Sequence, residues 1–111
     1  MKIVNRETFL KMPENTVFTK YEPGHFDELM IKGETLEFND FCEQQILEVE
    51  SNSGDFGEFI DILETAEKEG KSFNLDLHCE GRDGLFDNDQ LFAIFEKQDV
   101  EMLIERLKEC L

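Results

Sequence analysis

The hydrophobic residues of this chain repeat with two different periods, and this change of period limits the folds that the chain can adopt. In the middle of the chain, apolar residues recur at the 3–4-residue spacing of one helix face: Phe56, Phe59, Ile60, Leu63 and Ala66. The next segment alternates between apolar and polar residues, as a strand with one buried face does, and its apolar members are Phe73, Leu75, Leu77 and Cys79. An amphipathic helix followed by a strand predicts helices packed on a sheet.

Local signals predict three helices. The first is expected over residues 5–12, with Asn5 as its N-cap. The central helix follows Asp55 as N-cap and ends at Gly70, where a left-handed conformation closes it. The last helix follows Asp99 as N-cap, and its apolar stripe consists of Val100, Leu103, Ile104 and Leu107.

Five segments are predicted to be strands, on their alternation or their β-branched and aromatic content: 16–21, 28–32, 41–50, 72–80 and 90–96. The last is hydrophobic on both faces and is expected near the centre of the sheet. Short connections make neighbouring strands antiparallel. We therefore predict one α+β domain over residues 1–111, in the order α-β-β-β-α-β-β-α. Its sheet is mainly antiparallel with about five strands, and its three helices lie mostly on one face.

The composition excludes several classes of function. The chain has 27 acidic against 11 basic residues and a net charge of −16. Direct binding to nucleic acid needs Lys and Arg at the phosphates, and adsorption to an anionic membrane needs the same positive charge. No stretch approaches the roughly 20 apolar residues of a membrane-spanning helix, and the first ten residues lack the apolar core of a secretory signal. We therefore expect a cytoplasmic protein.

The cysteines and histidines indicate neither a disulfide framework nor a metal centre. The three cysteines are far apart and form no CxxC motif: Cys42, Cys79 and Cys110. Reduced thiols are the simplest interpretation. His78 and Cys79 are adjacent in a predicted strand, where their side chains point to opposite faces and cannot share a metal. His25 lies in a predicted turn.

The acidic residues do not form a recognisable catalytic or calcium-binding motif. With 27 acids, a pair such as Asp87 and Asp89 arises by chance. A calcium loop starting at Asp83 or at Asp87 would place Leu85 or Leu91 at a ligand position, so both registers fail. We predict no catalytic, cofactor-binding or metal-binding residue and no cofactor, and we expect that the protein is not an enzyme.

One stretch of the chain concentrates negative charge. Between Lys32 and Lys68 there is no Lys or Arg, and eleven acids lie in this interval: Glu34, Glu37, Asp40, Glu43, Glu48, Glu50, Asp55, Glu58, Asp61, Glu64 and Glu67. Clustered like charges destabilise a folded protein through repulsion. A row of carboxylates also imitates a run of phosphates and can occupy a basic nucleic-acid-binding site of another protein.

We predict that such a surface is built from six of these residues: Glu43, Glu48, Glu50, Glu58, Asp61 and Glu64. The expected partner is another protein with a basic surface, with no direct contact to nucleic acid or membrane. The alternative is that the acids only keep the protein soluble and monomeric.

Several short segments taken together resemble small uncharacterised acidic proteins of tailed phages and prophages. They are Lys2-Ile3-Val4, Thr8-Phe9-Leu10, Pro13, Thr16-Val17-Phe18, Tyr21-Glu22-Pro23, Ile31-Lys32-Gly33-Glu34-Thr35 and Asp89-Gln90-Leu91-Phe92-Ala93. The resemblance covers most of the chain, but no activity or catalytic residue is carried over with it. It implies a bacterial cytoplasm and a short accessory gene. Small acidic phage products are often inhibitors of host enzymes, which favours the mimicry hypothesis.

Two other functions remain open. The chain could be a small-ligand protein or an enzyme with an unrecognised cleft, and a deep pocket holding His25 or His78 beside a carboxylate would support this. It could also be a phage assembly subunit, which homo-oligomerisation would support. The sequence leaves the oligomeric state undetermined.

Overall fold

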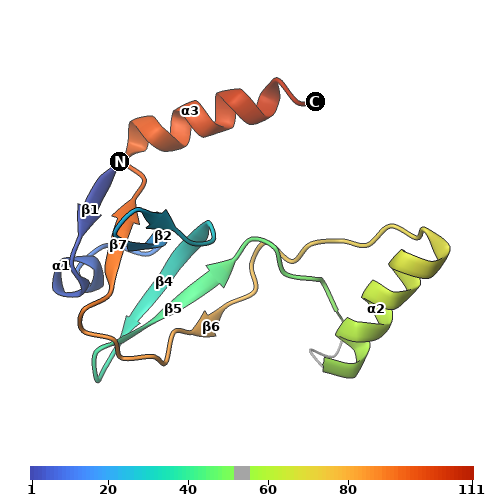
Figure 1. Cartoon of the computed structure of the whole chain (residues 1–111), viewed down its shortest axis with the longest axis horizontal. Helices are drawn as coiled ribbons and strands as arrows, with labels where there is room; N and C mark the ends of the chain where they lie inside the picture. Colours follow the sequence, from blue (N-terminus) through green and yellow to red (C-terminus); the bar gives the residue numbers. More distant parts are fainter. Residues whose placement is uncertain (52–55) are drawn as a thin grey trace. The chain divides into compact units, whose positions relative to one another are not determined.

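The computed structural model describes residues 1–51 and 56–111 and divides them into two compact units. The first, here called the sheet unit, comprises Met1–Gln45 and Glu80–Leu111. The second, here called the α2 unit, comprises Ile46–Cys79 (Figure 1). Each is described by itself, and the prediction of one domain over residues 1–111 stays a prediction.

The described elements confirm an α+β fold with an antiparallel sheet and three helices. Their order is β1 (Lys2–Val4), α1 (Arg6–Leu10), β2 (Val17–Glu22), β3 (His25–Phe26), β4 (Met30–Leu36), β5 (Asp40–Gln45), α2 (Phe56–Glu69), β6 (Gly81–Arg82), β7 (Leu91–Ile94) and α3 (Lys97–Lys108). The sheet has seven strands in the order β1-β7-β2-β4-β5-β6, and β3 pairs with β2 beside this path. All of its described pairs are antiparallel.

The strand predicted over 90–96 near the sheet centre is β7, which is an interior strand but lies next to the edge strand β1 rather than at the centre. β7 pairs with β1 on one side and with β2 on the other, and Phe92, Ala93 and Ile94 are all buried. β1 was not among the predicted strands, because three residues are too few to display an alternating pattern. The sequence therefore does not predict the pairing of β1 with β7 that the structure shows.

Helix α1 begins as the sequence predicts. The side chain of Asn5 accepts a hydrogen bond from the backbone N–H of Thr8 at 2.9 Å, which satisfies a donor at the helix start. The helix has only five residues, so its stability comes from packing rather than from its own hydrogen bonds. Phe9 supplies this packing because its side chain is fully buried.

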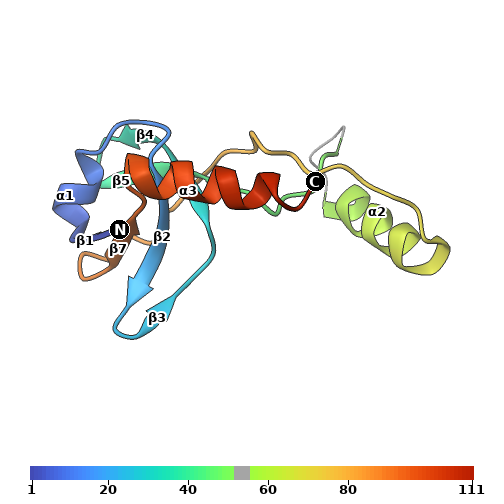
Figure 2. The same ribbon diagram turned by 90° about the horizontal axis from the view of Figure 1, so that it is seen from above.

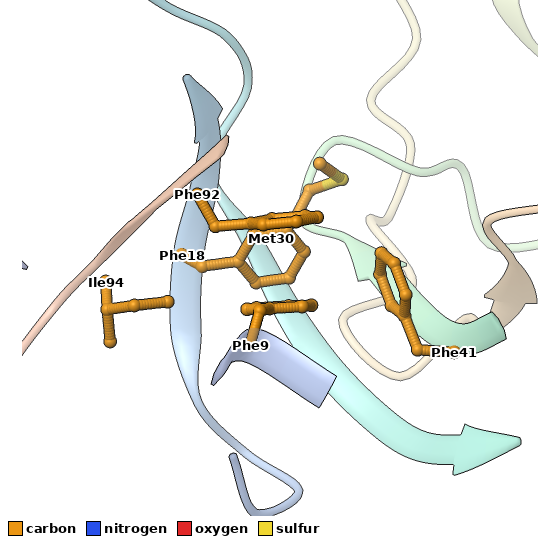
Figure 3. Close-up of a cluster of buried hydrophobic side chains, with 6 residues drawn as sticks. All are labelled: Phe9, Phe18, Met30, Phe41, Phe92 and Ile94. Carbon is orange, nitrogen blue, oxygen red and sulfur yellow. The ribbon is translucent and has the colours of Figure 1, made fainter. Parts of the chain in front are cut away.

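The core is a cluster of aromatic rings between α1 and one face of the sheet (Figure 3). The ring of Phe9 stacks on Phe92, with centroids 3.9 Å apart and planes at 4°. Phe41 meets Phe9 edge-on at 4.9 Å, and Phe18 lies tilted at 4.7 Å. Met30 and Ile94 complete the cluster. Tilted and edge-on contacts of this kind add to the free energy that the buried area supplies.

The predicted strand over 72–80 is wrong. Its one described bridge joins Leu75 to Val49, flanked by hydrogen bonds from Glu50 to Asn74 and from Asp76 to Glu48. Beyond the bridge, the carboxylate of Asp76 accepts the backbone N–H of His78 at 2.9 Å and forms a turn. An Asp side chain that bonds the local backbone competes with the hydrogen bonds of a strand.

Two further boundaries differ from the prediction. The strand expected over 41–50 is β5, which ends at Gln45. The two residues of β6 were not predicted to form a strand, and they pair with β5 at the end of the sheet. The alternation of Leu47 and Val49 with acidic residues extended the first prediction beyond the strand, and the two residues of β6 are too few to show a pattern.

The last helix starts earlier than predicted, and its stripe is not buried on the sheet. Glu96 is the N-cap of α3, and Asp99 lies three residues on, where its carboxylate accepts the backbone N–H of Glu96 at 2.8 Å. None of the residues of α3 is buried. Phe95 and Glu96 connect β7 to α3. The helix starts at the end of β7, as Figures 1 and 2 show.

The central helix ends as predicted. Gly70 has a φ of +69° and its N–H donates to the carbonyl of Ala66 at 3.0 Å, the left-handed closure expected of glycine. The predicted N-cap, Asp55, lies outside the described residues. The apolar stripe of this helix was expected to be buried. However, none of the described residues of α2 is buried, and Phe56 is 75% exposed.

The aromatic core generates the first prediction. Replacing Phe9 by Ala removes the ring on which Phe92 stacks, and we expect a loss of about 3–5 kcal/mol in the free energy of unfolding. Urea denaturation followed by circular dichroism measures it. The matched control is Phe38→Ala, because Phe38 is 86% exposed and should change stability by less than about 0.5 kcal/mol. Equal effects of the two substitutions would contradict this description of the core.

Candidate functional site

The α2 unit has the higher net negative charge per residue of the two units. Residues 46–79 contain nine acids and two lysines, hence a net charge of −7. Asp61 and Glu64 are exposed, and neither forms an ion pair with any residue that the structure describes. Glu58 is partly exposed on the same helix. Three of the six predicted site residues therefore lie on one helix.

Two more predicted site residues belong to the same unit. Glu48 and Glu50 lie on the segment whose backbone bonds to residues 74–76. Glu50 is exposed, whereas Glu48 is half-buried and lines a hollow of about 350 Å³. We call the five residues of this unit the α2 acidic surface: Glu48, Glu50, Glu58, Asp61 and Glu64.

The hollow combines apolar walls with carboxylates. Phe56 and Phe59 stack with centroids 6.0 Å apart, and Val49 and Cys79 add further apolar surface. The hollow is also lined by Glu48 and Asp76. Burial raises the pKa of the Cys79 thiol, and these two carboxylates raise it further, so the thiol is a weak nucleophile.

The sixth predicted residue, Glu43, lies in the sheet unit and faces a cation. Its carboxylate oxygen Oε2 is buried, 3.9 Å from Nζ of Lys20, and accepts no hydrogen bond from the described residues. Burial raises the pKa of Glu43, an effect that Lys20 only partly offsets. With a side chain only 14% exposed, Glu43 offers little surface to a partner.

Glu43 belongs to a buried ionic cluster that the sequence did not reveal. Asp83 is its centre, with a side chain 1% exposed. The carboxylate of Asp83 lies 2.6 Å from Nζ of Lys20 and 3.6 Å from Nη1 of Arg6. Arg6 also donates to the backbone carbonyl of Asn39 at 2.7 Å. In sequence Asp83 lies in a polar turn, and no local pattern distinguishes a buried aspartate from an exposed one.

A second ion pair fixes the same end of the sheet. Asp40 is fully buried and accepts hydrogen bonds from the side chain of Arg82 at 2.9 Å and from the backbone N–H of Gly84 at 3.0 Å. Burial by itself would raise the pKa of Asp40, but these hydrogen bonds outweigh it and lower that pKa. Residues 82–84 are thus held by buried carboxylates, which gives the acids there a structural role.

His25 lines a small cavity and His78 lies at the surface. His25 lies in β3 and lines a cavity of about 130 Å³ with Glu22, Asp27, Lys20 and Gln90. Small-molecule sites usually measure about 300–1,000 Å³, so this hollow is small for a substrate. His78 is exposed in the α2 unit.

The remaining cysteines show no activated thiol. Cys42 is half-buried, and burial followed by the neighbouring Glu80 carboxylate raises its pKa. Cys110 is exposed just beyond α3. No group of three or more His, Cys, Asp or Glu residues within 1–51 and 56–111 is placed to hold a metal ion. No helix in these ranges is long and apolar enough to cross a membrane.

Comparisons with protein-family models, with curated proteins and with solved structures gave no match to this chain.

The ionic cluster generates the second prediction. Asp83→Asn keeps the shape of the side chain but removes the charge that neutralises Lys20 and Arg6. We expect a loss of about 3 kcal/mol or more in the free energy of unfolding at neutral pH, because buried Arg6 loses its carboxylate and Lys20 keeps only Glu43, at 3.9 Å. Urea denaturation measures it, with the exposed Asp87→Asn as control at less than about 0.5 kcal/mol. A small effect of Asp83→Asn would show that the cluster is not structurally required.

Glu43 generates a third prediction, on pH. Its pKa in the folded protein is raised above the usual 4.5, so the folded state binds more protons than the unfolded state in the window above 4.5. Stability contributed by this group therefore falls as pH rises through that window. Glu43→Gln removes this loss, and the stability of the variant relative to wild type should increase as the pH rises above 4.5. Denaturation at several pH values tests this, and a constant difference would contradict it.

Proposed function

We propose that this chain is a binding protein without catalytic activity, and that its α2 acidic surface docks on a basic, nucleic-acid-binding site of another protein. The observation that carries the proposal is the uncompensated charge of the α2 unit. Among the described residues of this unit, exposed acids such as Asp61 and Glu64 have no basic neighbour within ion-pairing distance. Acids of the sheet unit, in contrast, form ion pairs with Lys20, Arg6 and Arg82.

The apolar hollow in the same unit indicates what the partner would present. A Lys or Arg side chain has an apolar stem and a charged end, so it suits a hollow with aromatic walls and a carboxylate rim. The walls here are Phe56 and Phe59, and the rim includes Glu48 and Asp76. Lys and Arg are also the residues that bind phosphates in nucleic-acid sites. This supports a basic protein surface as the partner.

The phage hypothesis belongs to the same proposal. A short accessory protein of a phage or prophage would act in a bacterial cytoplasm, where nucleic-acid enzymes with basic sites are abundant targets. Binding of this kind is steered by charge, so it should weaken as salt screens the interaction.

Charge reversal provides the fourth prediction. We expect Glu50→Lys, Asp61→Lys and Glu64→Lys together to weaken capture of the partner by at least about 100-fold at low salt, because three attractive contacts become repulsive. The measurement is a pull-down from bacterial lysate at low and high salt, with the captured protein identified and then titrated. The partner should bind nucleic acid, and duplex DNA should compete with this chain for it.

The control reverses three exposed acids of the sheet unit: Glu22→Lys, Glu28→Lys and Glu37→Lys. This variant has the same net charge as the α2 variant but keeps the α2 acidic surface, so it should retain most of the binding. Unchanged binding by the α2 variant, with its circular dichroism spectrum intact, would rule out the proposed docking surface. Equal losses in both variants would show that net charge alone is responsible.

A further inference from the structure

Helix α3 presents an apolar stripe that its own sheet does not cover. Ile104 is 46% exposed and Leu107 is 58% exposed, while Val100 and Leu103 are half-buried. These four residues lie along one face at spacings of three and four, the pattern of a helix that packs on another helix. The exposed fractions of Ile104 and Leu107 show that this face is accessible. The stripe is thus available for a partner helix.

The charge of α3 differs from that of the rest of the chain. Lys97–Lys108 contains three acids and three bases, so its net charge is zero in a protein of net charge −16. Along the helix, Lys97 lies 3.9 Å from Glu101 and Lys108 lies 3.3 Å from Glu105. Two copies of this protein would repel each other across most surfaces, but that repulsion is absent between two α3 helices.

The positions of the charges on α3 match those of an antiparallel copy. Asp99 and Arg106 are seven residues apart, which places them on one flank of the stripe, and Glu101 and Lys108 are related in the same way on the other flank. A twofold axis that relates two antiparallel helices sets each flank against the same flank of the partner. Glu101 then meets Lys108 of the other copy, whereas the carboxylate of Asp99 already accepts a hydrogen bond from the N-terminal amine at 2.6 Å.

We propose that two copies of this chain pair through α3, antiparallel and about a twofold axis. Leu103 and Leu107 of each copy pack against the stripe of the other, with Glu101 facing Lys108 of the second copy. This inference does not depend on the α2 acidic surface, because it uses only residues of the sheet unit.

The length of α3 sets the expected strength of the pair. Twelve residues span about 18 Å, so the helices alone bury less than the roughly 1,200 Å² of a stable interface. We therefore expect a reversible dimer with a dissociation constant in the range of about 1 µM to 100 µM. Sedimentation of the full chain over this concentration range should show a monomer–dimer equilibrium. A monomer at all concentrations would overturn the proposal.

A charge exchange tests the antiparallel arrangement. Glu101→Lys alone and Lys108→Glu alone should each weaken the dimer about tenfold, since each places like charges opposite one another in the homodimer. A one-to-one mixture of the two variants should recover dimerisation, because every pair across the interface is then opposite in sign. The ion pairs within each helix are not restored by mixing. Recovery therefore reports contact between copies, and no recovery would overturn the antiparallel pairing.

A second pair of variants tests the stripe itself. Leu107→Glu should abolish the dimer, whereas Gln98→Glu adds the same charge on the opposite face of α3 and should leave it unchanged. Because Leu107 is exposed in the monomer, the substitution should not unfold the chain, and circular dichroism checks this. An unchanged dimer in Leu107→Glu, or equal losses in both variants, would show that α3 is not the interface.

Discussion

The sheet unit depends on the contact between the rings of Phe9 and Phe92. Helix α1 is too short to be stable by itself, and β7 is placed between two strands that are distant from it in sequence. The stacked rings, 3.9 Å apart, join these two elements, and Phe18 and Phe41 pack around them from β2 and β5. Four phenylalanines from four elements thus form the core, and the packing of these side chains aligns the strands of the sheet.

Charges occupy what remains of the interior. Lys32 is 1% exposed and donates to Oγ1 of Thr35 at 2.6 Å and to the carbonyl of Gly33 at 3.1 Å, while Lys20 and Arg6 converge on Asp83. Burial lowers the pKa of Lys32, because the charged ammonium has lost water. Each buried charged side chain of this small core needs its ion-pair or hydrogen-bond partner, because an unpaired buried ion lowers the stability by several kcal/mol. Part of the acidic excess of the sheet unit is therefore required for its folded structure.

Prediction from sequence succeeded where a local pattern determined the structure. Asn5 at the start of α1, the left-handed Gly70 and the hydrophobic β7 each follow from residues close in the chain. Prediction failed where a residue distant in the sequence determines the local structure. Apolar and polar residues alternate over 72–80 as regularly as in a strand. Yet the one described bridge of this segment pairs Leu75 with Val49. Glu43 was predicted to be exposed on the evidence of its acidic neighbours, but its position is determined by Lys20 on another strand.

The two units differ in how their acidic residues are paired, and under the proposed function this difference bears on two explanations that net charge alone cannot distinguish. An excess that served only solubility could be placed on any exposed surface. In the sheet unit, 18 acids accompany nine bases and several are paired at the sheet, whereas the α2 unit has nine acids and two bases around an apolar hollow. Repulsion within a unit of 34 residues lowers its stability. The proposed docking on a basic, partly apolar partner would account for a surface that keeps such repulsion beside the exposed ring of Phe56.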